Sequence, residues 1–413
     1  MGEFILARGN GRKIPKEDKI FGIAGRAKAA IAEKGRDNVV NGTVGALFDD
    51  DGNLVILDSV VKEFKDLDPR DFAEYAPIGG IPAFKEAVKK AAFGNHMPKG
   101  YLEAVATPGG TGSLRNTISN YSDRGDQILT SDWHWSPYGT IAGEIGRSVA
   151  TYEMLTPGGK FNAGSFKEKV HELLERQQSL VIIINTPAHN PTGYSLTLED
   201  WNNVIDVLCE EAKSGKTIVP LVDVAYIDFA GDEDEYRKFF DLFERFPENV
   251  LPVVAYSLSK TCTLYGGRCG AMICVAKTPE IAAEFKSVCE FSSRGSWSNS
   301  AKFGQVILSR IYGDPELLAK VSEERAYFRN MLLARGRAFS EAAEDCGLTI
   351  VPYDGGFFVS IPCEDPDGAS AILEEEDIFL VPLAKGLRLS LASAPEDKCK
   401  DLPPKIKAAI EKL

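Results

Sequence analysis

The sequence predicts an α/β fold: a large domain with a mostly parallel central sheet covered by helices, and a smaller α+β domain formed by both ends of the chain. Two observations lead to this prediction. Four short segments are apolar on successive residues, which suits strands buried on both faces; they span residues 180–185, 218–223, 250–257 and 270–276. Amphipathic helical patterns separate them, and alternation of strand and helix is typical of an α/β domain.

Two helix starts between these strands have recognisable signals. Ser165-Phe-Lys-Glu168 and Thr197-Leu-Glu-Asp200 both match the capping box, in which a hydroxyl and an acidic side chain each accept from a backbone amide. The apolar residues after the second signal recur at the spacing of one helical face; they are Trp201, Val204, Ile205, Leu208 and Ala212. We therefore expect a helix to begin at each signal.

A change of pattern on both flanks indicates a second domain. Residues 1–45 are mixed in character and rich in Gly and Lys. A long helical pattern at 315–346 is followed by short strand-like segments such as GGFFVSIP and GLRLSLAS. We expect a large domain at 47–310 and a discontinuous small domain made of 1–46 and 311–413.

The net charge and the cysteines exclude some classes of partner and indicate the cellular compartment. The 413 residues include 47 Lys and Arg against 60 Asp and Glu, a formal net charge of −13, which argues against nucleic acid or an anionic membrane as the main partner. Eight cysteines form no C-x-x-C pair, as expected of reduced thiols in the cytoplasm. The first residues lack the long apolar stretch of a signal peptide, and no run of 18 apolar residues indicates a membrane span.

Several familiar phosphate and metal motifs are absent from the sequence. There is no G-x-x-x-x-G-K-[ST] loop of the P-loop nucleotide-binding proteins. The glycine-rich turn that begins at Gly109 carries Arg115 where a dinucleotide fingerprint needs its last glycine. His171-Glu172 has no second histidine on the same helical face, so we predict no metal site.

The most specific segment is Ser257-Leu-Ser-Lys260, which begins where a predicted strand ends and is followed by Arg268. Strand ends are the usual place for sites in open α/β sheets. A lysine buried there is costly unless it is paired or uncharged, and an uncharged amine is what a Schiff-base lysine needs. Arg268 and the nearby serine hydroxyls offer donors for a phosphate. The alternative is a surface loop with a lysine in a salt bridge.

Four further segments fit such a site, and three of them have an ordinary structural alternative. Gly109-Gly110-Thr111-Gly112 can present helix-start amides to a phosphate, or serve only as a tight turn. Asn190-Pro-Thr-Gly193 can offer an amide to a ligand oxygen, or simply form a turn. Asp223 closes a buried strand, where a carboxylate needs a cation such as a protonated ring nitrogen. Arg388 suits a carboxylate, or a surface salt bridge.

The order and spacing of these segments resemble a known family. The chain resembles pyridoxal-phosphate-dependent aminotransferases of class I/II, the aspartate and aromatic type within the fold-type-I group. The resemblance covers most of the chain. It runs in order through Gly42-Thr-Val-Gly45, Tyr75-Ala-Pro-Ile-Gly-Gly, GGTG, NPTG, Asp223-Val-Ala-Tyr226, SLSK and Arg388.

The resemblance implies a role for each matching residue. Lys260 would hold pyridoxal 5′-phosphate as a Schiff base and then move the proton at the substrate Cα. Asp223 would keep the ring nitrogen protonated, while Tyr226 and Asn190 would hydrogen-bond the ring oxygen. The phosphate would be bound by Gly110, Thr111, Ser257 and Arg268.

Substrate binding and assembly follow from the same resemblance. Arg388 would grip the substrate α-carboxylate, assisted by the backbone of Gly45 and by Asn190. Tyr75 would reach the cofactor phosphate of a neighbouring subunit, which implies a homodimer with shared active sites. Arg294 resembles the arginine that such enzymes send into the partner's site to bind a side-chain carboxylate, with glutamate or aspartate as donor and 2-oxoglutarate as acceptor; alternatively it is a surface arginine.

The aromatic residue that stacks on the cofactor ring has two candidates in Ser131-Asp-Trp133-His-Trp135. We prefer Trp133, although the surrounding sequence departs from the family pattern by about one residue.

Three functions are compatible with parts of this pattern. The first is transamination between an L-amino acid, whether aspartate, glutamate or aromatic, and a 2-oxo acid. The second is a fold-type-I lyase or decarboxylase, because the cofactor residues serve an intermediate common to these reactions. The third is a non-catalytic module of a transcription regulator, which the net charge of −13 disfavours.

Overall fold

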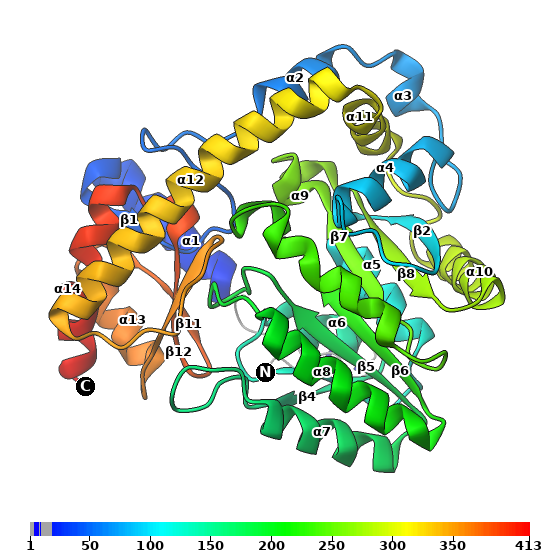
Figure 1. The fold of residues 1–413 in the computed structure, drawn as a ribbon. Helices are drawn as coiled ribbons and strands as arrows, with labels where there is room; N and C mark the ends of the chain where they lie inside the picture. The colour runs from blue at the N-terminus through cyan, green and yellow to red at the C-terminus, as the bar shows by residue number, and fades with distance from the viewer. Residues whose placement is uncertain (1–3, 8, 10–18) are drawn as a thin grey trace.

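A seven-stranded sheet forms the centre of the larger part of the molecule (Figure 1). The structure is a computed structural model that describes residues 4–7, 9 and 19–413. In spatial order the strands are β2 (Tyr101–Thr107), β8 (Gly270–Ala276), β7 (Val253–Ser257), β6 (Thr217–Asp223), β5 (Ser179–Asn185), β3 (Gln127–Ser131) and β4 (Ser148–Tyr152).

The four predicted strands are confirmed as β5, β6, β7 and β8, with one difference in direction. β4, β3, β5, β6 and β7 run parallel to one another, as expected of segments buried on both faces. β8 is antiparallel to both β7 and β2. Continuous apolarity reports burial on both faces and carries no information about strand direction, so the sequence could not distinguish the two cases.

Helices cover both faces of this sheet. One face packs against α4 (Pro82–Phe93), α7 (Ala163–Arg176), α8 (Leu198–Glu211) and α11 (Lys302–Gly313), and the other against α5 (Gly109–Asn120), α6 (Pro137–Glu144) and α10 (Pro279–Ser296). Within β5, Leu180, Ile182 and Ile184 face the first layer. Val181 and Ile183 face the second. The alternation along one strand shows why its sequence is apolar throughout.

The helix-start signals are confirmed in one case and wrong in the other. Thr197 and Asp200 form the reciprocal capping box that begins α8. The helix expected at Ser165 instead begins at Ala163, where the side chain of Asn162 accepts from the Ser165 amide. Ser165 uses its own hydroxyl to accept from the Glu153 amide. The Ser165 hydroxyl, which the local pattern assigned to the helix cap, therefore bonds to the distant Glu153 amide instead.

The smaller part of the molecule combines both ends of the chain. β11 (Val381–Leu383), β12 (Gly386–Ser390) and β9 (Phe358–Pro362) form an antiparallel sheet, and β1 (Val40–Asn41) pairs in parallel with β10 (Ile378–Phe379). The helices here are α1 (Lys19–Lys34), α13 (Pro366–Glu375) and α14 (Glu396–Glu411). Residues 1–3, 8 and 10–18 of the predicted first segment lie outside the described residues, and the boundaries 47–310, 1–46 and 311–413 stay a prediction.

The remaining elements are short and lie mostly at strand or helix ends. They comprise α2 (Asp58–Lys65), α3 (Pro69–Ala73), α9 (Leu258–Thr261) and the 3₁₀ turns η1 (Arg36–Asn38), η2 (Ala212–Ser214), η3 (Ile227–Phe229), η4 (Glu235–Arg245), η5 (Tyr265–Gly267) and η6 (Leu391–Ser393). Within the described residues, no helix combines the length and apolar character that crossing a bilayer requires.

The long helix α12 (Pro315–Cys346) confirms the helical pattern at 315–346 and connects the two parts of the molecule (Figure 1). Its first half lies near α2 and α11, and its second half packs on α14. Arg335 is the main polar anchor of its second half, with 1% of the side chain exposed. Its guanidinium donates to the carbonyls of Leu391, Ala392 and Phe48 and pairs with Asp50.

Removing this anchor should destabilise the protein. An Arg335→Ala substitution leaves three backbone carbonyls without their donor, so we expect the free energy of unfolding to fall by about 3 kcal/mol. Arg337→Ala is the matched control, because Arg337 is an exposed arginine on the same helix, and we expect a change within about 0.5 kcal/mol. Urea denaturation of both variants measures the difference, and equal losses would contradict the anchor.

Candidate active site

The ends of the central strands bring polar residues together at one edge of the sheet. Asn185 pairs in register with Asp223, the last residue of β6. Ser257 ends β7 and pairs with Gly270, which begins the antiparallel strand β8. Gly270 also pairs with Thr107 at the end of β2. The reversed direction of β8 therefore places the start of one strand beside the ends of its neighbours.

A cavity of about 190 Å³ opens at this edge. It is lined by three aromatic side chains, several amide and hydroxyl groups, one carboxylate and two cationic side chains. The lining residues are Gly110, Thr111, Leu114, Trp135, Tyr138, Asn185, Asn190, Asp223, Ala225, Tyr226, Ser257, Ser259, Lys260 and Arg268.

Lys260 lies on the one-turn helix α9, directly after β7. Its Nζ is 5.4 Å from the ring centroid of Tyr226 and 5.6 Å from that of Tyr265. The pKa of the Lys260 amine is lowered to about 8, mainly by burial; Asp223 opposes this shift, and Arg268 and Arg388 add to it. A substantial fraction of this amine is therefore neutral near pH 8, with its lone pair available to attack a carbonyl.

Asp223 is a buried carboxylate held by neutral donors. The Tyr138 hydroxyl donates to its Oδ2 at 2.8 Å, and the Ala225 amide donates to Oδ1 at 3.3 Å. Burial raises the pKa of Asp223 above its ordinary value, although these two donors and Lys260 oppose the rise. Such a carboxylate is ready to pair with a cationic ligand group, which would relieve the cost of its burial.

Two asparagines connect neighbouring strand ends to the turn after β5. Asn185 donates to the Asp223 carbonyl at 2.8 Å and accepts from the Asn190 amide at 2.7 Å. Asn190 in turn donates to the Tyr226 hydroxyl at 3.3 Å. These bonds place the Tyr226 hydroxyl and the Asn190 side chain on one wall of the cavity, within reach of a ligand oxygen.

The glycine-rich turn and Arg268 form a cradle for an anion. α5 begins at Gly109 without a side-chain cap, so its first amides face the cavity with the positive end of the helix dipole. Gly109 has a φ of +66°, and a Cβ there would lie 2.5 Å from Nη2 of Arg268. The glycine thus admits the guanidinium beside the helix start. Ser257 and Ser259 complete the cradle, and Arg268 donates to the Ser259 hydroxyl at 3.2 Å.

Arg388 is buried next to the cavity, on β12 of the smaller sheet. It donates to the Thr43 carbonyl at 2.9 Å and to Oδ1 of Asn190 at 3.5 Å. Its guanidinium carbon lies 4.5 Å from the ring centroid of Phe358. Its Nε has no hydrogen-bond partner among the described residues. Burial lowers the pKa of Arg388 to about 10, so it stays cationic at neutral pH and can bind a carboxylate.

The predicted ring contact requires a correction. Trp133 lies outside the cavity: its ring is buried in the core formed with α7 and α8, and Lys385 Nζ lies 6.0 Å from its centroid. Trp135 lines the cavity instead and packs edge-on against Tyr138 at 5.6 Å. A turn after β3, closed by the bond from the Ser131 hydroxyl to the Trp133 carbonyl, directs the two tryptophans to different sides.

Besides Trp133 and Arg388, three further predicted residues do not line this cavity. Gly45 lies beside Arg388, and a Cβ there would approach the Phe358 ring to 3.2 Å. The side chain of Tyr75 is exposed, with a relative accessibility of 90%. Arg294 is exposed near the end of α10 and donates to the Ser298 hydroxyl at 2.6 Å.

Two polar residues of the cavity, Asn185 and Tyr138, were not singled out by the sequence. Asn185 is the last residue of a buried strand, as Asp223 is, and this position in the sequence could have identified it as a site residue. Tyr138 meets Asp223 from 85 positions away in the chain, and no local pattern indicates such a pair. Among the described residues, no group of three or more potential metal ligands occurs.

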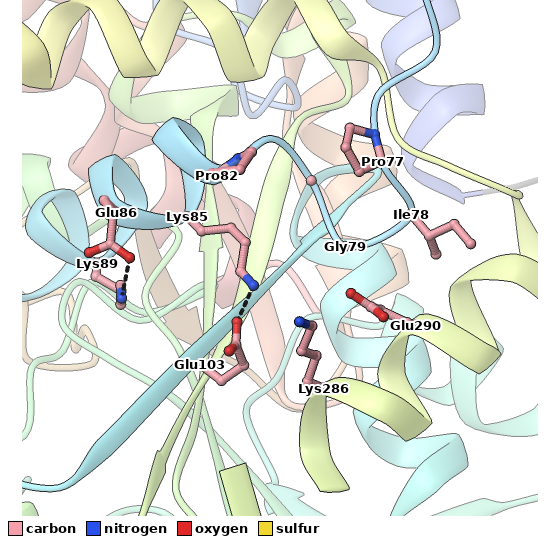
Figure 2. Close-up of a pocket in the computed structure, with 11 residues that line it drawn as sticks. Pro77, Ile78, Gly79, Pro82, Lys85, Glu86, Lys89, Glu103, Lys286 and Glu290 are labelled. Atoms are coloured by element: carbon pink, nitrogen blue, oxygen red, sulfur yellow. Dashed lines mark hydrogen bonds and ion pairs between the residues drawn. The ribbon is translucent and has the colours of Figure 1, made fainter. Parts of the chain in front are cut away.

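A larger hollow of about 490 Å³ lies elsewhere, between α4, β2 and α10 (Figure 2). Its walls carry Lys85, Lys89 and Lys286 together with Glu86, Glu103 and Glu290. Lys85 pairs with Glu103, and Lys89 with Glu86. These charges largely neutralise one another. We therefore place the chemistry in the smaller cavity, where an amine of lowered pKa, a carboxylate and an anion cradle converge.

Comparison with known proteins shows the family of the chain. The family model of aminotransferase class I and II matches residues 37–406. An aspartate aminotransferase of Pseudomonas aeruginosa is 28% identical over 311 residues, which are 72% of this chain and 75% of that protein.

Solved structures are similar over nearly the whole chain. An aminotransferase from Anaerococcus prevotii is 38% identical with a TM-score of 0.96, covering 98% of this chain and 100% of that chain. An aromatic-amino-acid aminotransferase from Burkholderia pseudomallei, covalently bound to pyridoxal phosphate, is 22% identical with a TM-score of 0.79. The match covers 98% of this chain and 100% of that chain. This second likeness shows the fold.

The lowered pKa of Lys260 can be measured on the protein without ligand. Trace acetylation with acetic anhydride modifies neutral amines only, so the Lys260 peptide should label with a midpoint near pH 8. Exposed lysines in the same digest should label with the ordinary midpoint near pH 10.5. Mass spectrometry of the digest gives both profiles, and an ordinary midpoint for Lys260 would contradict the buried site.

Proposed function

The chain belongs to the class I and II aminotransferase family, and from this premise we propose that it holds pyridoxal 5′-phosphate in the Lys260 cavity. We propose further that it moves an amino group between an L-amino acid, whether aspartate, glutamate or aromatic, and a 2-oxo acid such as 2-oxoglutarate. The observation that carries the proposal is the convergence of Lys260, Asp223 and the uncapped start of α5 at one sheet edge.

The residues of the cavity fit this cofactor. When bound, it supplies an aldehyde that takes up an amino group and a protonated ring that withdraws electrons from the substrate Cα. Asp223 would pair with the ring nitrogen, and Tyr226 and Asn190 would hydrogen-bond the ring oxygen. The cradle of Gly110, Thr111, Ser257 and Arg268 would hold the phosphate, because helix-start amides and a guanidinium are suited to that anion.

Lys260 and Arg388 supply the remaining functions. The Lys260 amine, a substantial fraction of which is neutral near pH 8, can form the covalent link to the cofactor. Its Nζ can then take the proton from the substrate Cα and return it. Arg388 would bind the substrate carboxylate through donors that include its unpartnered Nε, with Gly45 and Asn190 beside it. A fixed carboxylate orients the Cα–H bond toward Lys260.

Assembly as a homodimer is part of the proposal. Tyr75 and Arg294 are exposed and lie outside the cavity of their own chain, which suits residues that contribute to a second copy. There Tyr75 would reach the cofactor phosphate, and Arg294 would bind the side-chain carboxylate of an acidic substrate. The eight cysteines are free, in keeping with the proposed cytoplasmic location. No observation favours a lyase or decarboxylase over transamination.

Covalent attachment of the cofactor tests the role of Lys260. After incubation with pyridoxal 5′-phosphate and borohydride reduction, we expect the added mass on the peptide that contains Lys260. A Lys260→Ala protein should carry no such modified peptide. Lys277→Ala is the control, because Lys277 follows β8 at the opposite edge of the sheet and its loss should leave the attachment unchanged. Attachment at another lysine in the wild-type protein would refute the assignment.

The two tryptophans can be distinguished by substitution. Trp135→Ala should raise the dissociation constant for pyridoxal 5′-phosphate about tenfold, because it removes a ring from the cavity wall. Trp133→Ala should instead lower the free energy of unfolding by about 3 kcal/mol through a core cavity, with cofactor affinity nearly unchanged. Equilibrium dialysis and urea denaturation measure the two effects, and the reverse pattern would restore Trp133 as the ring contact.

A further inference from the structure

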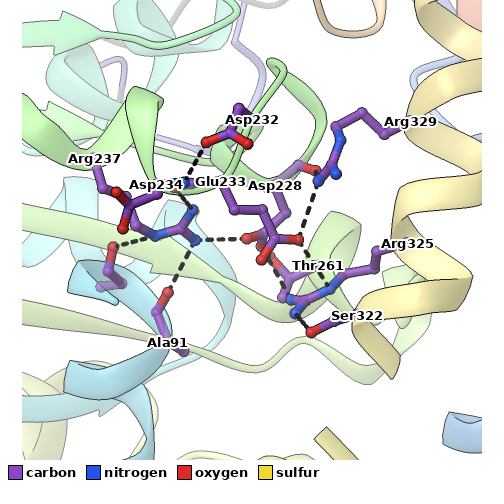
Figure 3. A network of polar contacts seen from close by, with 11 residues as sticks. Ala91, Asp228, Asp232, Glu233, Asp234, Arg237, Thr261, Ser322, Arg325 and Arg329 are labelled. Atoms are coloured by element: carbon purple, nitrogen blue, oxygen red, sulfur yellow. Dashed lines mark hydrogen bonds and ion pairs between the residues drawn. The ribbon is translucent and has the colours of Figure 1, made fainter. Parts of the chain in front are cut away.

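A buried carboxylate lies directly behind the catalytic cavity without lining it. Asp228 is in η3, two residues after Tyr226, and 1% of its side chain is exposed. Its Oδ2 accepts from the Thr261 hydroxyl at 2.5 Å, and its Oδ1 accepts from Nη2 of Arg237 at 2.6 Å (Figure 3). Thr261 is the residue after Lys260. One carboxylate thus joins the segment that carries Tyr226 to the segment that carries Lys260.

Arginines from two other elements hold this carboxylate in place. Arg237, in η4, also donates to the carbonyls of Ala91 and Ala92 at the end of α4. Arg325, on α12, lies 3.5 Å from Oδ2 of Asp228 with 2% of its side chain exposed. One turn further along α12, Arg329 donates to the Asp228 carbonyl at 3.4 Å (Figure 3).

The arginines keep Asp228 in its charged form. Burial alone would raise the pKa of this carboxyl, but Arg325 and Arg237 outweigh burial and hold the pKa below its ordinary value. Asp228 is therefore a permanent, charged acceptor for the Thr261 hydroxyl at neutral pH. A charge-assisted hydrogen bond of this kind is about twice as strong as one between neutral groups.

The helix that carries Lys260 needs such an anchor. α9 comprises only four residues, and one helical turn is not stable without tertiary contacts. At its start, the Ser257 hydroxyl accepts from the Ser259 amide. At its end, the side-chain anchor is the bond from Thr261 to Asp228. Loss of that bond would leave the end of α9 without its side-chain anchor, so that Lys260 could shift.

We propose that Asp228 is a positioning residue that acts through Thr261 to hold the Lys260 amine and Tyr226 in a fixed relative geometry. The catalytic consequence rests on the proposed function, whereas the positioning is a property of the protein without cofactor.

The same cluster connects the amine to the carboxylate-binding side of the cavity. Arg325 and Arg335 lie ten residues apart on α12, about 15 Å along one continuous helix. Arg335 binds the carbonyls of Leu391 and Ala392, just beyond the strand that carries Arg388. The helix α12 therefore contacts both Asp228, behind Lys260, and the residues that follow β12, which carries Arg388.

The test uses Thr261, because substituting Asp228 itself would leave two arginines buried without their partner and could prevent folding. Thr261→Val removes the hydroxyl and keeps the shape, while Thr261→Ser keeps the hydroxyl. Ser370→Ala is the matched control, since it removes a buried hydroxyl that donates to the Leu380 carbonyl in the smaller part of the molecule. The readout is the acetylation profile of Lys260 in the protein without cofactor.

A loosened α9 should expose the Lys260 amine to more water, so its midpoint should rise from about 8 by about half a pH unit in Thr261→Val. The charged groups that face this amine, Asp223, Arg268 and Arg388, are unchanged in every variant. Thr261→Ser and Ser370→Ala should keep the wild-type midpoint. An unchanged midpoint in Thr261→Val, or an equal rise in either other variant, would overturn the proposal.

Activity gives a second, independent measurement. We expect Thr261→Val to lower kcat for amino transfer about tenfold with KM nearly unchanged, since misplacement of a proton-transfer group affects the chemical step. Thr261→Ser should restore kcat. A wild-type protein without aminotransferase activity would refute the proposed function and leave the acetylation result as the test of positioning. A shift in KM alone would refute positioning and leave the function intact.

Discussion

The register of the central sheet is the constraint on which the rest of the site depends. Parallel β5, β6 and β7 end at the same edge, and antiparallel β8 begins there. The pairing of Asn185 with Asp223, and of Ser257 with Gly270, sets the distances between the groups that follow. A slip of β6 by one residue would turn the side chain of Asp223 to the opposite face of the sheet. The two helix layers make such a slip costly, because each strand is buried on both faces.

The cavity is positively charged, although the protein as a whole is acidic. The chain carries a net charge of −13, yet the charged groups that act on the Lys260 amine are two arginines, Arg268 and Arg388, and one carboxylate, Asp223. Burial and the two arginines together depress the pKa of the lysine amine. The same positive field favours ligands with phosphate and carboxylate groups. Net charge describes the surface in contact with water and does not describe the site.

Much of this arrangement could be predicted from the sequence, because strand ends and glycine-rich helix starts have local signatures. Lys260, Asp223, Arg268 and Asn190 are brought together as expected. The predictions that failed share one cause: the role of a side chain depended on a residue distant in the sequence, which a local pattern does not include. Ser165 binds Glu153 rather than capping its helix, and the turn after β3 selects Trp135 over Trp133. Tyr138 and Asp228 gain their roles only from distant residues.

The central claim is that this cavity transfers an amino group. Its most direct test supplies ¹⁵N-aspartate with unlabelled 2-oxoglutarate, and in parallel ¹⁵N-phenylalanine with the same acceptor, and follows the label by mass spectrometry. We expect ¹⁵N-glutamate to form in step with consumption of the donor, with no labelled ammonium and no loss of carbon dioxide. Label released as ammonium, or a donor decarboxylated while glutamate stays unlabelled, would contradict the account.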